Sequence, residues 1–119
     1  MTILIVQGFF SFCNHKTDAH LYGKAELDFK KWYFDHYEKV DKDYYPAFEK
    51  YSPTLRVALF IEFFDSKDLR IVSQYLPEKK EWQHEINSKV LEHSPMGTRI
   101  ESDIEGIEKA NLIYNFKNK

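Results

Sequence analysis

The sequence contains little cysteine, glycine or proline, and each shortage excludes a class of protein. Its 119 residues include one Cys, four Gly and four Pro. A single cysteine, Cys13, forms no intramolecular disulfide, which fits a reducing compartment. Four scattered glycines leave no Gly-rich loop of the kind that holds nucleotide phosphates. So few Gly and Pro also argue against a disordered or repetitive chain.

The sequence also lacks long apolar runs and an excess of basic charge. No apolar stretch approaches the ~20 residues that a membrane-spanning helix needs. The first residues lack the basic region and cleavage site of a signal peptide. The formal net charge is −2, whereas nucleic-acid binding needs a concentrated basic surface. We therefore expect a cytoplasmic protein that contacts no membrane and no nucleic acid directly.

Aromatic residues are abundant. They make up 17% of the chain, with 10 Phe and 8 Tyr. Phenylalanine fills cores, whereas tyrosine often lies at an interface because its hydroxyl needs a polar or wet partner. A chain of this length buries about two thirds of its unfolded surface and needs no disulfide or metal to fold. We expect residues 1–119 to form one globular domain.

The hydrophobic pattern predicts an α+β fold. Strands are expected at 3–12, 54–64, 69–76 and 110–116, the second and third forming a hairpin. Helices are expected at 24–40, 43–51 and 77–94. The stretch 98–109 is expected to be a short strand followed by an acidic loop. This order resembles the split βαβ plan of ferredoxin-like domains, with a four-stranded, mainly antiparallel sheet and helices on one face.

A group of metal-binding and nucleophilic residue types follows the first expected strand. It comprises Cys13, His15, Asp18 and His20. The spacing matches no standard zinc site, which needs paired ligands and a fourth partner. A nucleophilic Cys13 needs a lowered pKa and a positioned base, and the sequence shows neither. We therefore predict no metal, no cofactor and no catalytic residue, and interpret the group as a packed cysteine followed by a solvated loop.

Glu62 is a carboxylate within an apolar stretch, and two interpretations stay open. It is either a buried acid in a cleft or one partner of an ion pair with Arg56 or Arg70 on a solvated sheet face. We favour the ion pair. Phe60 and Phe64 would share that face, and such a mixture is typical of a binding surface. An RNA-binding sheet needs basic neighbours beside its aromatics, and here the neighbours are largely acidic.

Tyrosines and carboxylates are concentrated around 35–45, and a second acidic run spans 101–108. Aromatic anchors and desolvated charge pairs dominate protein interfaces, and acidic surfaces steer towards basic partners. The alternative is two solvated faces whose tyrosines pack at helix edges. The predicted partner-binding residues are Asp35, Tyr37, Glu38, Asp41, Asp43, Tyr44, Tyr45, Glu101, Asp103 and Glu105.

Two stretches of the chain resemble bacterial immunity proteins of contact-dependent and polymorphic toxin systems. They are KKWYFDHYEKVDKDYYPAF at 30–48 and LRVALFIEFFDSKDLRIVSQYLPEKKEW at 55–82. The resemblance implies a cytoplasmic protein that neutralises one toxin by stoichiometric binding. The partner it implies is a basic toxin domain, often a nuclease, whose cleft an acidic surface covers. No motif carries family binding residues over, so the predicted interface depends on local chemistry.

A second function stays open, a small ferredoxin-like enzyme or a ligand-binding dimer. Its pocket would lie near Glu62, with Arg70, His15 and His20 as further polar groups. A monomer without a concave pocket near Glu62 would argue against it.

Overall fold

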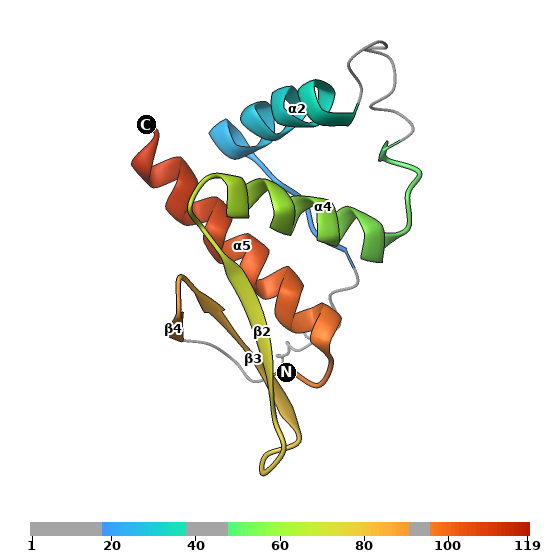
Figure 1. Ribbon diagram of the computed structural model, residues 1–119, viewed down its shortest axis with the longest axis vertical. Coiled ribbons are helices and arrows are strands. Elements are labelled where there is room, and N and C mark those ends of the chain that lie inside the picture. The colour runs from blue at the N-terminus through green and yellow to red at the C-terminus, as the bar shows by residue number, and fades with distance from the viewer. Residues whose placement is uncertain (1–17, 38–47, 91–95) are drawn as a thin grey trace, which may run out of the picture.

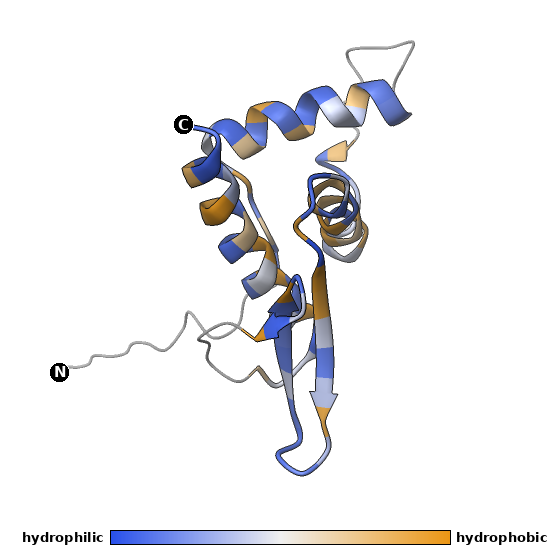
Figure 2. Ribbon diagram, turned by 60° about the vertical axis from the view of Figure 1, so that its left-hand side comes forward, coloured by the Kyte–Doolittle hydropathy of each residue, from blue (hydrophilic) through white to orange (hydrophobic). Residues whose placement is uncertain are grey.

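The computed structural model describes residues 18–37, 48–90 and 96–119. Its elements are α2 (Gly23–Tyr37), α4 (Pro53–Ser66), β2 (Ile71–Leu76), β3 (Glu81–Ile86), β4 (Lys89–Val90) and α5 (Arg99–Lys117). Helices α2 and α4 pack on one side of α5, and the β2–β3 hairpin runs along its other side (Figure 1). The hairpin turn projects beyond all three helices in both views, and Figure 2 shows its far end to be largely hydrophilic.

The sheet is antiparallel, with strand order β2-β3-β4. Ile71 lies opposite Ile86, and Ser73 opposite His84. These four residues share the face that packs on α5, because side chains alternate between the two faces of a strand. Gly106 of α5 sits so close to this face that a Cβ there would meet Ile71 Cγ2 at 2.7 Å.

The predicted α+β class is confirmed, but the four-stranded sheet and the ferredoxin-like order are wrong. Within the described ranges the chain forms three helices and a three-stranded antiparallel sheet. The predicted strand at 3–12 lies outside the described residues, as does most of the predicted helix at 43–51. Three predicted segments account for the difference, and each has its own physical cause.

The stretch 54–64 is the helix α4 rather than a strand. Ser52 is its N-cap, with the side chain accepting from the backbone N–H of Leu55, and Pro53 occupies its first turn. The segment is apolar on all sides, so alternation and helical spacing fit it equally well. The buried residues Val57, Phe60 and Phe64 follow three- and four-residue steps. Ser52-Pro53, which directly follows the helix predicted at 43–51, therefore begins a helix.

The helix predicted at 77–94 is also wrong in its described part. Residues 77–80 form a turn, and β3 and β4 follow. Asn87 and Ser88 have φ of 54° and 70°, as a two-residue hairpin loop requires. Trp82 and Ile86 suggested a helical stripe, yet together with His84 they also alternate, and the strand pattern is the one adopted.

The strands predicted after 98 are replaced by α5. Thr98 and Glu101 form a reciprocal capping box at its start. Ile104, Ile107 and Tyr114 then recur at helical spacing and are buried. The pattern was overlooked because polar residues interrupt it and a central Gly106 lowers helix propensity.

Two predicted elements are confirmed over their described residues, the helix at 24–40 as α2 and the strand at 69–76 as β2. Helix α2 buries Phe29, Trp32 and Tyr33 but leaves Leu27 66% exposed. Phe29 is the centre of an aromatic core, with five ring centroids between 4.8 and 6.0 Å from its own. These rings are Trp32, Tyr33, Phe48, Phe60 and Phe63.

Candidate functional site

A continuous groove runs between α4, the edge of β2 and the first turns of α5. Two adjoining cavities of about 490 and 350 Å³ form it, and Ala58 and Ile61 of α4 line both. We call it the α4 groove. Its apolar floor is Val57, Ala58, Ile61, Ile71 and Ile100. Its rim is Glu62, Asp65, Arg70, Arg99 and Asp103.

The floor of the groove joins the buried side chains of Val57 and Ile71 to accessible apolar surface on α4. Ala58 is exposed and Ile61 half-buried, although both lie on a helix whose opposite side is in the core. Val72 of β2, which also lines the groove, is 45% exposed. A contiguous apolar surface with a polar rim is typical of a contact site for another molecule.

At one end of the rim, Tyr37 and Glu62 are joined. The Tyr37 hydroxyl donates to Glu62 Oε1 at 2.7 Å. This hydrogen bond, together with burial and the charge of Glu62, raises the pKa of Tyr37. Tyr37 remains 46% exposed. A predicted partner-binding tyrosine therefore stands at the groove with its hydroxyl held by a carboxylate.

The interpretations of Glu62 need correction. Arg70 Nε lies 3.2 Å from Asp65 Oδ1, and Arg56 binds Asp18, so neither arginine pairs with Glu62 as expected. The shared face with Phe60 and Phe64 is also wrong, because both rings are buried in the core. The cause is the change from strand to helix, which turns residues 60 and 64 inward and leaves residue 62 outside.

At the other end of the groove, Asp103 attaches α5 to the sheet. Its Oδ1 accepts from the Ser73 hydroxyl at 2.5 Å, and Ser73 Oγ lies 2.9 Å from Ser102 Oγ. Burial raises the pKa of Asp103, against the opposing effects of the Ser73 hydrogen bond and the Arg99 charge. Arg99 Nε lies 3.8 Å from Asp103 Oδ2.

The structure brings Tyr37 and Asp103 to the groove and places three other predicted interface residues elsewhere. Glu101 closes the capping box, since its Oε1 accepts from the Thr98 backbone N–H at 3.1 Å. Glu105 is half-buried on α5. Asp35 lines a separate cavity on α2 with several lysines. The remaining predicted interface residues, Glu38, Asp41, Asp43, Tyr44 and Tyr45, lie outside the described residues.

Sequence reasoning missed the groove floor. Ala58 and Ile61 are three residues apart, with Val57 adjacent, and form a second apolar stripe on α4. An apolar stretch of this length, read as a helix, has more apolar surface than one core can cover. That surplus was the available signal, and the assignment to a strand concealed it.

A polar layer between α5 and the sheet contains serine, histidine and aspartate but not in a nucleophilic arrangement. His84, which falls within the helix predicted at 77–94, is instead fully buried in β3, with Nε2 3.1 Å from Lys109 Nζ. Ser73 is bonded to Asp103 directly. A serine nucleophile needs a histidine as its base and an acid behind the histidine. The observed bonds instead attach α5 to β2 and β3.

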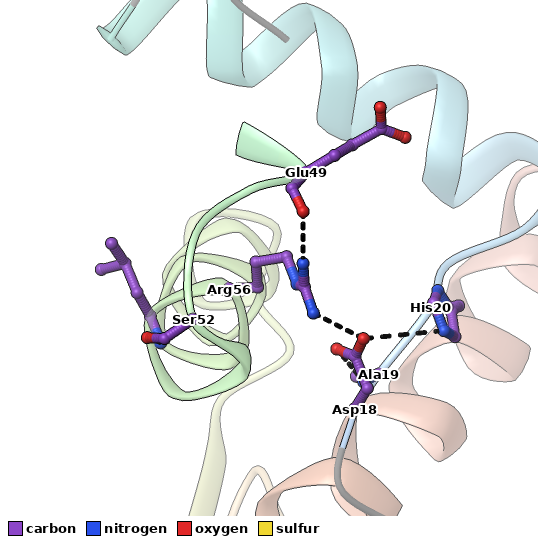
Figure 3. Close-up of polar contacts among 7 residues, drawn as sticks. Asp18, Ala19, His20, Glu49, Ser52 and Arg56 are labelled. Atoms are coloured by element: carbon purple, nitrogen blue, oxygen red, sulfur yellow. Dashed lines mark hydrogen bonds and ion pairs between the residues drawn. The ribbon is translucent and has the colours of Figure 1, made fainter. Parts of the chain in front are cut away.

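Asp18 and His20, two members of the group predicted after the first strand, lie in a set of polar contacts with Arg56 of α4, which we call the Arg56 clamp. Asp18 Oδ2 lies 2.5 Å from Arg56 Nη2 and 3.9 Å from His20 Nε2, while Arg56 Nη1 donates to the Glu49 carbonyl at 2.7 Å (Figure 3). Both terminal nitrogens of Arg56 are thus engaged within the chain. The Arg56 clamp fixes residues 18–22 and the 48–52 turn to α4. Cys13 and His15 lie outside the described residues.

No group of three or more His, Cys, Asp or Glu side chains that could hold a metal occurs in the part of the chain that the structure describes. No described helix combines the length and the apolarity needed to cross a membrane. No protein-family model, curated protein or solved structure was found to match the chain.

Proposed function

We propose that this protein is a cytoplasmic binding module that neutralises one toxin, a basic nuclease domain, by stoichiometric binding. The α4 groove with its Tyr37–Glu62 pair is the observation that supports this most. It combines an apolar floor, a half-exposed tyrosine and a rim of three carboxylates and two arginines. Tyrosines anchored beside apolar pockets are frequent binding hot spots.

The charges of the rim favour a basic partner. Arg70 is paired with Asp65 and Arg99 with Asp103, which leaves the Glu62 carboxylate as the net charge of the rim. A negative rim around an apolar centre is the usual layout of an interface with a cationic protein. Because exposed charges are screened by salt, association should slow as ionic strength rises.

The test begins with co-purification of the full chain from its native cells at low salt. We expect one basic protein at one-to-one stoichiometry. The dissociation constant of the purified pair is then measured for the Tyr37→Ala variant, with Tyr22→Ala as the matched control. Tyr22 is 51% exposed at the opposite end of α2. Tyr37→Ala should weaken binding about thirtyfold, and Tyr22→Ala should leave it unchanged.

Two results count against the proposal. Recovery of the chain without a basic partner, from cells that contain the candidate toxin, removes the function itself. Equal dissociation constants for the parent and Tyr37→Ala remove the α4 groove as the interface while leaving the partnership intact.

Binding of a small ligand is the second candidate, favoured by the cavity of about 350 Å³ beside Glu62 and Arg70. Small-molecule sites enclose most of their ligand and direct several polar groups at it. The rim arginine here is already held by Asp65. Screening metabolites by thermal shift, with Glu62→Gln as the control, distinguishes this candidate from a protein-binding role.

A further inference from the structure

Strand β2 has one open edge among the described residues, since β3 is its single described partner. The direction of its backbone groups follows from the register. Asn87 N donates to Arg70 O, and Trp82 exchanges hydrogen bonds with Met96 on the far side of β3. Antiparallel pairs alternate between bonded and non-bonded. The N–H and C=O groups of Ile71, Ser73 and Tyr75 therefore point to the open edge.

The open edge lacks the features that normally block strand addition. Edge strands are commonly protected by charged residues, prolines or bulges. β2 reads IVSQYL, with no charge and no proline, and pairs with β3 in unbroken register. Its exposed side chains therefore offer an incoming strand no electrostatic barrier.

The α4 groove lies alongside this edge. Helix α4 extends from the start of β2 towards the side away from β3 and β4 (Figure 1). Ile71 and Val72 line the groove together with Ala58 and Ile61. A strand added beside β2 would thus place alternate side chains on the apolar floor, beneath α4, while its backbone bonds with β2.

We propose that the open edge of β2 binds an extended segment of the protein partner as an additional strand. This rests on the proposed function and specifies how the partner is held. The segment alternates apolar side chains, which enter the α4 groove, with basic ones on the outer face. That outer face carries Glu81 and Glu85 on β3, and Glu62 supplies the negative charge at the rim.

Strand addition combines two sources of affinity that this surface offers together. Backbone hydrogen bonds provide binding independent of side-chain identity, and pockets for alternate side chains provide selectivity. The groove supplies the pockets, and the three outward N–H groups supply the donors. A folded globular surface would use the groove but leave those donors without a protein acceptor.

The test uses the full chain and a capped ten-residue peptide of alternating valine and lysine. The control peptide has the same length with glutamate in place of lysine. Amide exchange is followed by NMR at Ile71, Ser73 and Tyr75, with Val72 and Gln74 as internal references because their N–H groups face β3. We expect the valine–lysine peptide to slow exchange at the first three about tenfold at saturation.

A matched pair of variants separates the groove from general charge effects. Ala58→Arg fills the floor with a cationic side chain at an exposed position that the fold tolerates. Leu112→Arg makes the same charge change at a 59% exposed position on α5 outside the groove. Protection by the peptide should be lost in Ala58→Arg and retained in Leu112→Arg.

Three results overturn the proposal. The first is slow exchange at Ile71, Ser73 and Tyr75 in the free protein, which shows that another part of the chain or a second copy already covers the edge. The second is equal protection by both peptides or in both variants. The third is a bound natural partner that leaves these three amides exchanging freely. The third result removes strand addition but leaves the toxin-binding function intact. Failure to recover a partner removes the toxin-binding function, whereas the peptide experiment still measures whether the edge of β2 accepts a strand.

Discussion

Helix α5 is packed in two chemically different ways on its two sides. Towards α2 and α4 the contacts are aromatic, with Tyr114 5.8 Å from Phe63 and 6.2 Å from Phe64 between ring centroids. Towards the sheet, the bonds of Ser73 with Asp103 and of His84 with Lys109 form a polar layer beside the buried side chains of Ile71 and Ile86. The same helix thus joins a dry core to a hydrogen-bonded layer.

The comparison indicates which side carries stability. Burial of aromatic rings is favourable at every pH, and dispersion adds to it in a close-packed core. Buried polar groups repay only part of their desolvation and depend on each partner being present. We therefore expect the helical side to set the global stability and the hairpin side to yield locally.

The largest effect should come from Phe63→Ala on the helical side. Phe63 is fully buried and its ring lies 5.5 Å from Phe29. Removing the ring should lower the free energy of unfolding by about 3–5 kcal/mol, as measured by urea denaturation. Phe116→Ala is the control, at a 72% exposed position in the last turn of α5. It should change the free energy of unfolding by less than about 0.5 kcal/mol. Equal losses would contradict the dry-core interpretation.

Gly106→Ala tests the hairpin side. Its new Cβ would meet Ile71 Cγ2 at 2.7 Å, so the sheet must shift even though alanine favours the helix. We expect a net loss of about 1–3 kcal/mol, with faster amide exchange in β2 and β3 than in α2. Ile71→Leu removes the branched methyl, so the double variant should recover about 1 kcal/mol. Strict additivity would show that the close approach is not the cause.

A segment of this fold can be predicted from the sequence when its hydrophobic pattern is compatible with only one type of secondary structure. The helix α2 and the strand β2 each show one clear period, and both were predicted. The stretch 54–64 satisfies two periods at once, so local pattern alone does not decide it. The decisive information was the cap at Ser52-Pro53 and the length of the apolar run, which exceeds a usual strand.

The hairpin strand β3 shows a different limit. Trp82, His84 and Ile86 alternate, but Trp82 and Ile86 are also four apart. The turn after β3 needs a left-handed conformation at Asn87 and Ser88, which neither residue type imposes with the strength of glycine. Tertiary packing against α5 selects the strand, and a single sequence does not reveal that packing.

The candidate site was predictable only in part, for a related reason. A local concentration of tyrosines and carboxylates predicts exposed polar residues, and Tyr37 was chosen on that basis. The α4 groove is made by three elements that meet only in the fold. Asp103 was chosen as a surface carboxylate, yet its placement opposite Ser73 turns it inward, which follows from the helix phase of α5.

Tyr114→Phe tests a polar bond on the helical side. The Tyr114 hydroxyl donates to Asp28 Oδ2 at 2.5 Å. Burial and the Asp28 hydrogen bond raise the pKa of Tyr114 to about 12. Burial alone would raise the pKa of Asp28, but the hydrogen bonds from Tyr114 and Lys24 outweigh burial and lower this pKa below 3.8. We expect the variant to lose about 1–2 kcal/mol at neutral pH.

The pH profile of that loss follows from both shifts. A lowered carboxylate pKa contributes stability above 3.8 that disappears as pH falls through the folded-state value. A raised tyrosine pKa contributes stability below 10.0 that disappears as pH rises towards about 12. The difference between parent and Tyr114→Phe should therefore be largest between these limits in urea denaturation. A difference that stays constant at both extremes contradicts the assignment.

Asp103→Asn should have the smallest effect and the opposite pH dependence. Burial raises the pKa of Asp103 above 3.8, so its ionised form is the costly one in the folded state. The stability it contributes is complete below 3.8 and is lost as pH rises through the raised value. Asparagine keeps an acceptor for the Ser73 hydroxyl without ionising.

The variant should therefore match the parent at acid pH and exceed it by less than about 1 kcal/mol at neutral pH. Urea denaturation at both pH values measures this difference. Asp35→Asn, at an exposed position on α2, is the control, and its stability relative to the parent should not change between the two pH values. If Asp103→Asn is instead the less stable protein at neutral pH, the Arg99 charge outweighs burial. The polar layer would then stabilise α5 through its ion pair, and the two sides of the helix would differ less than their contacts indicate.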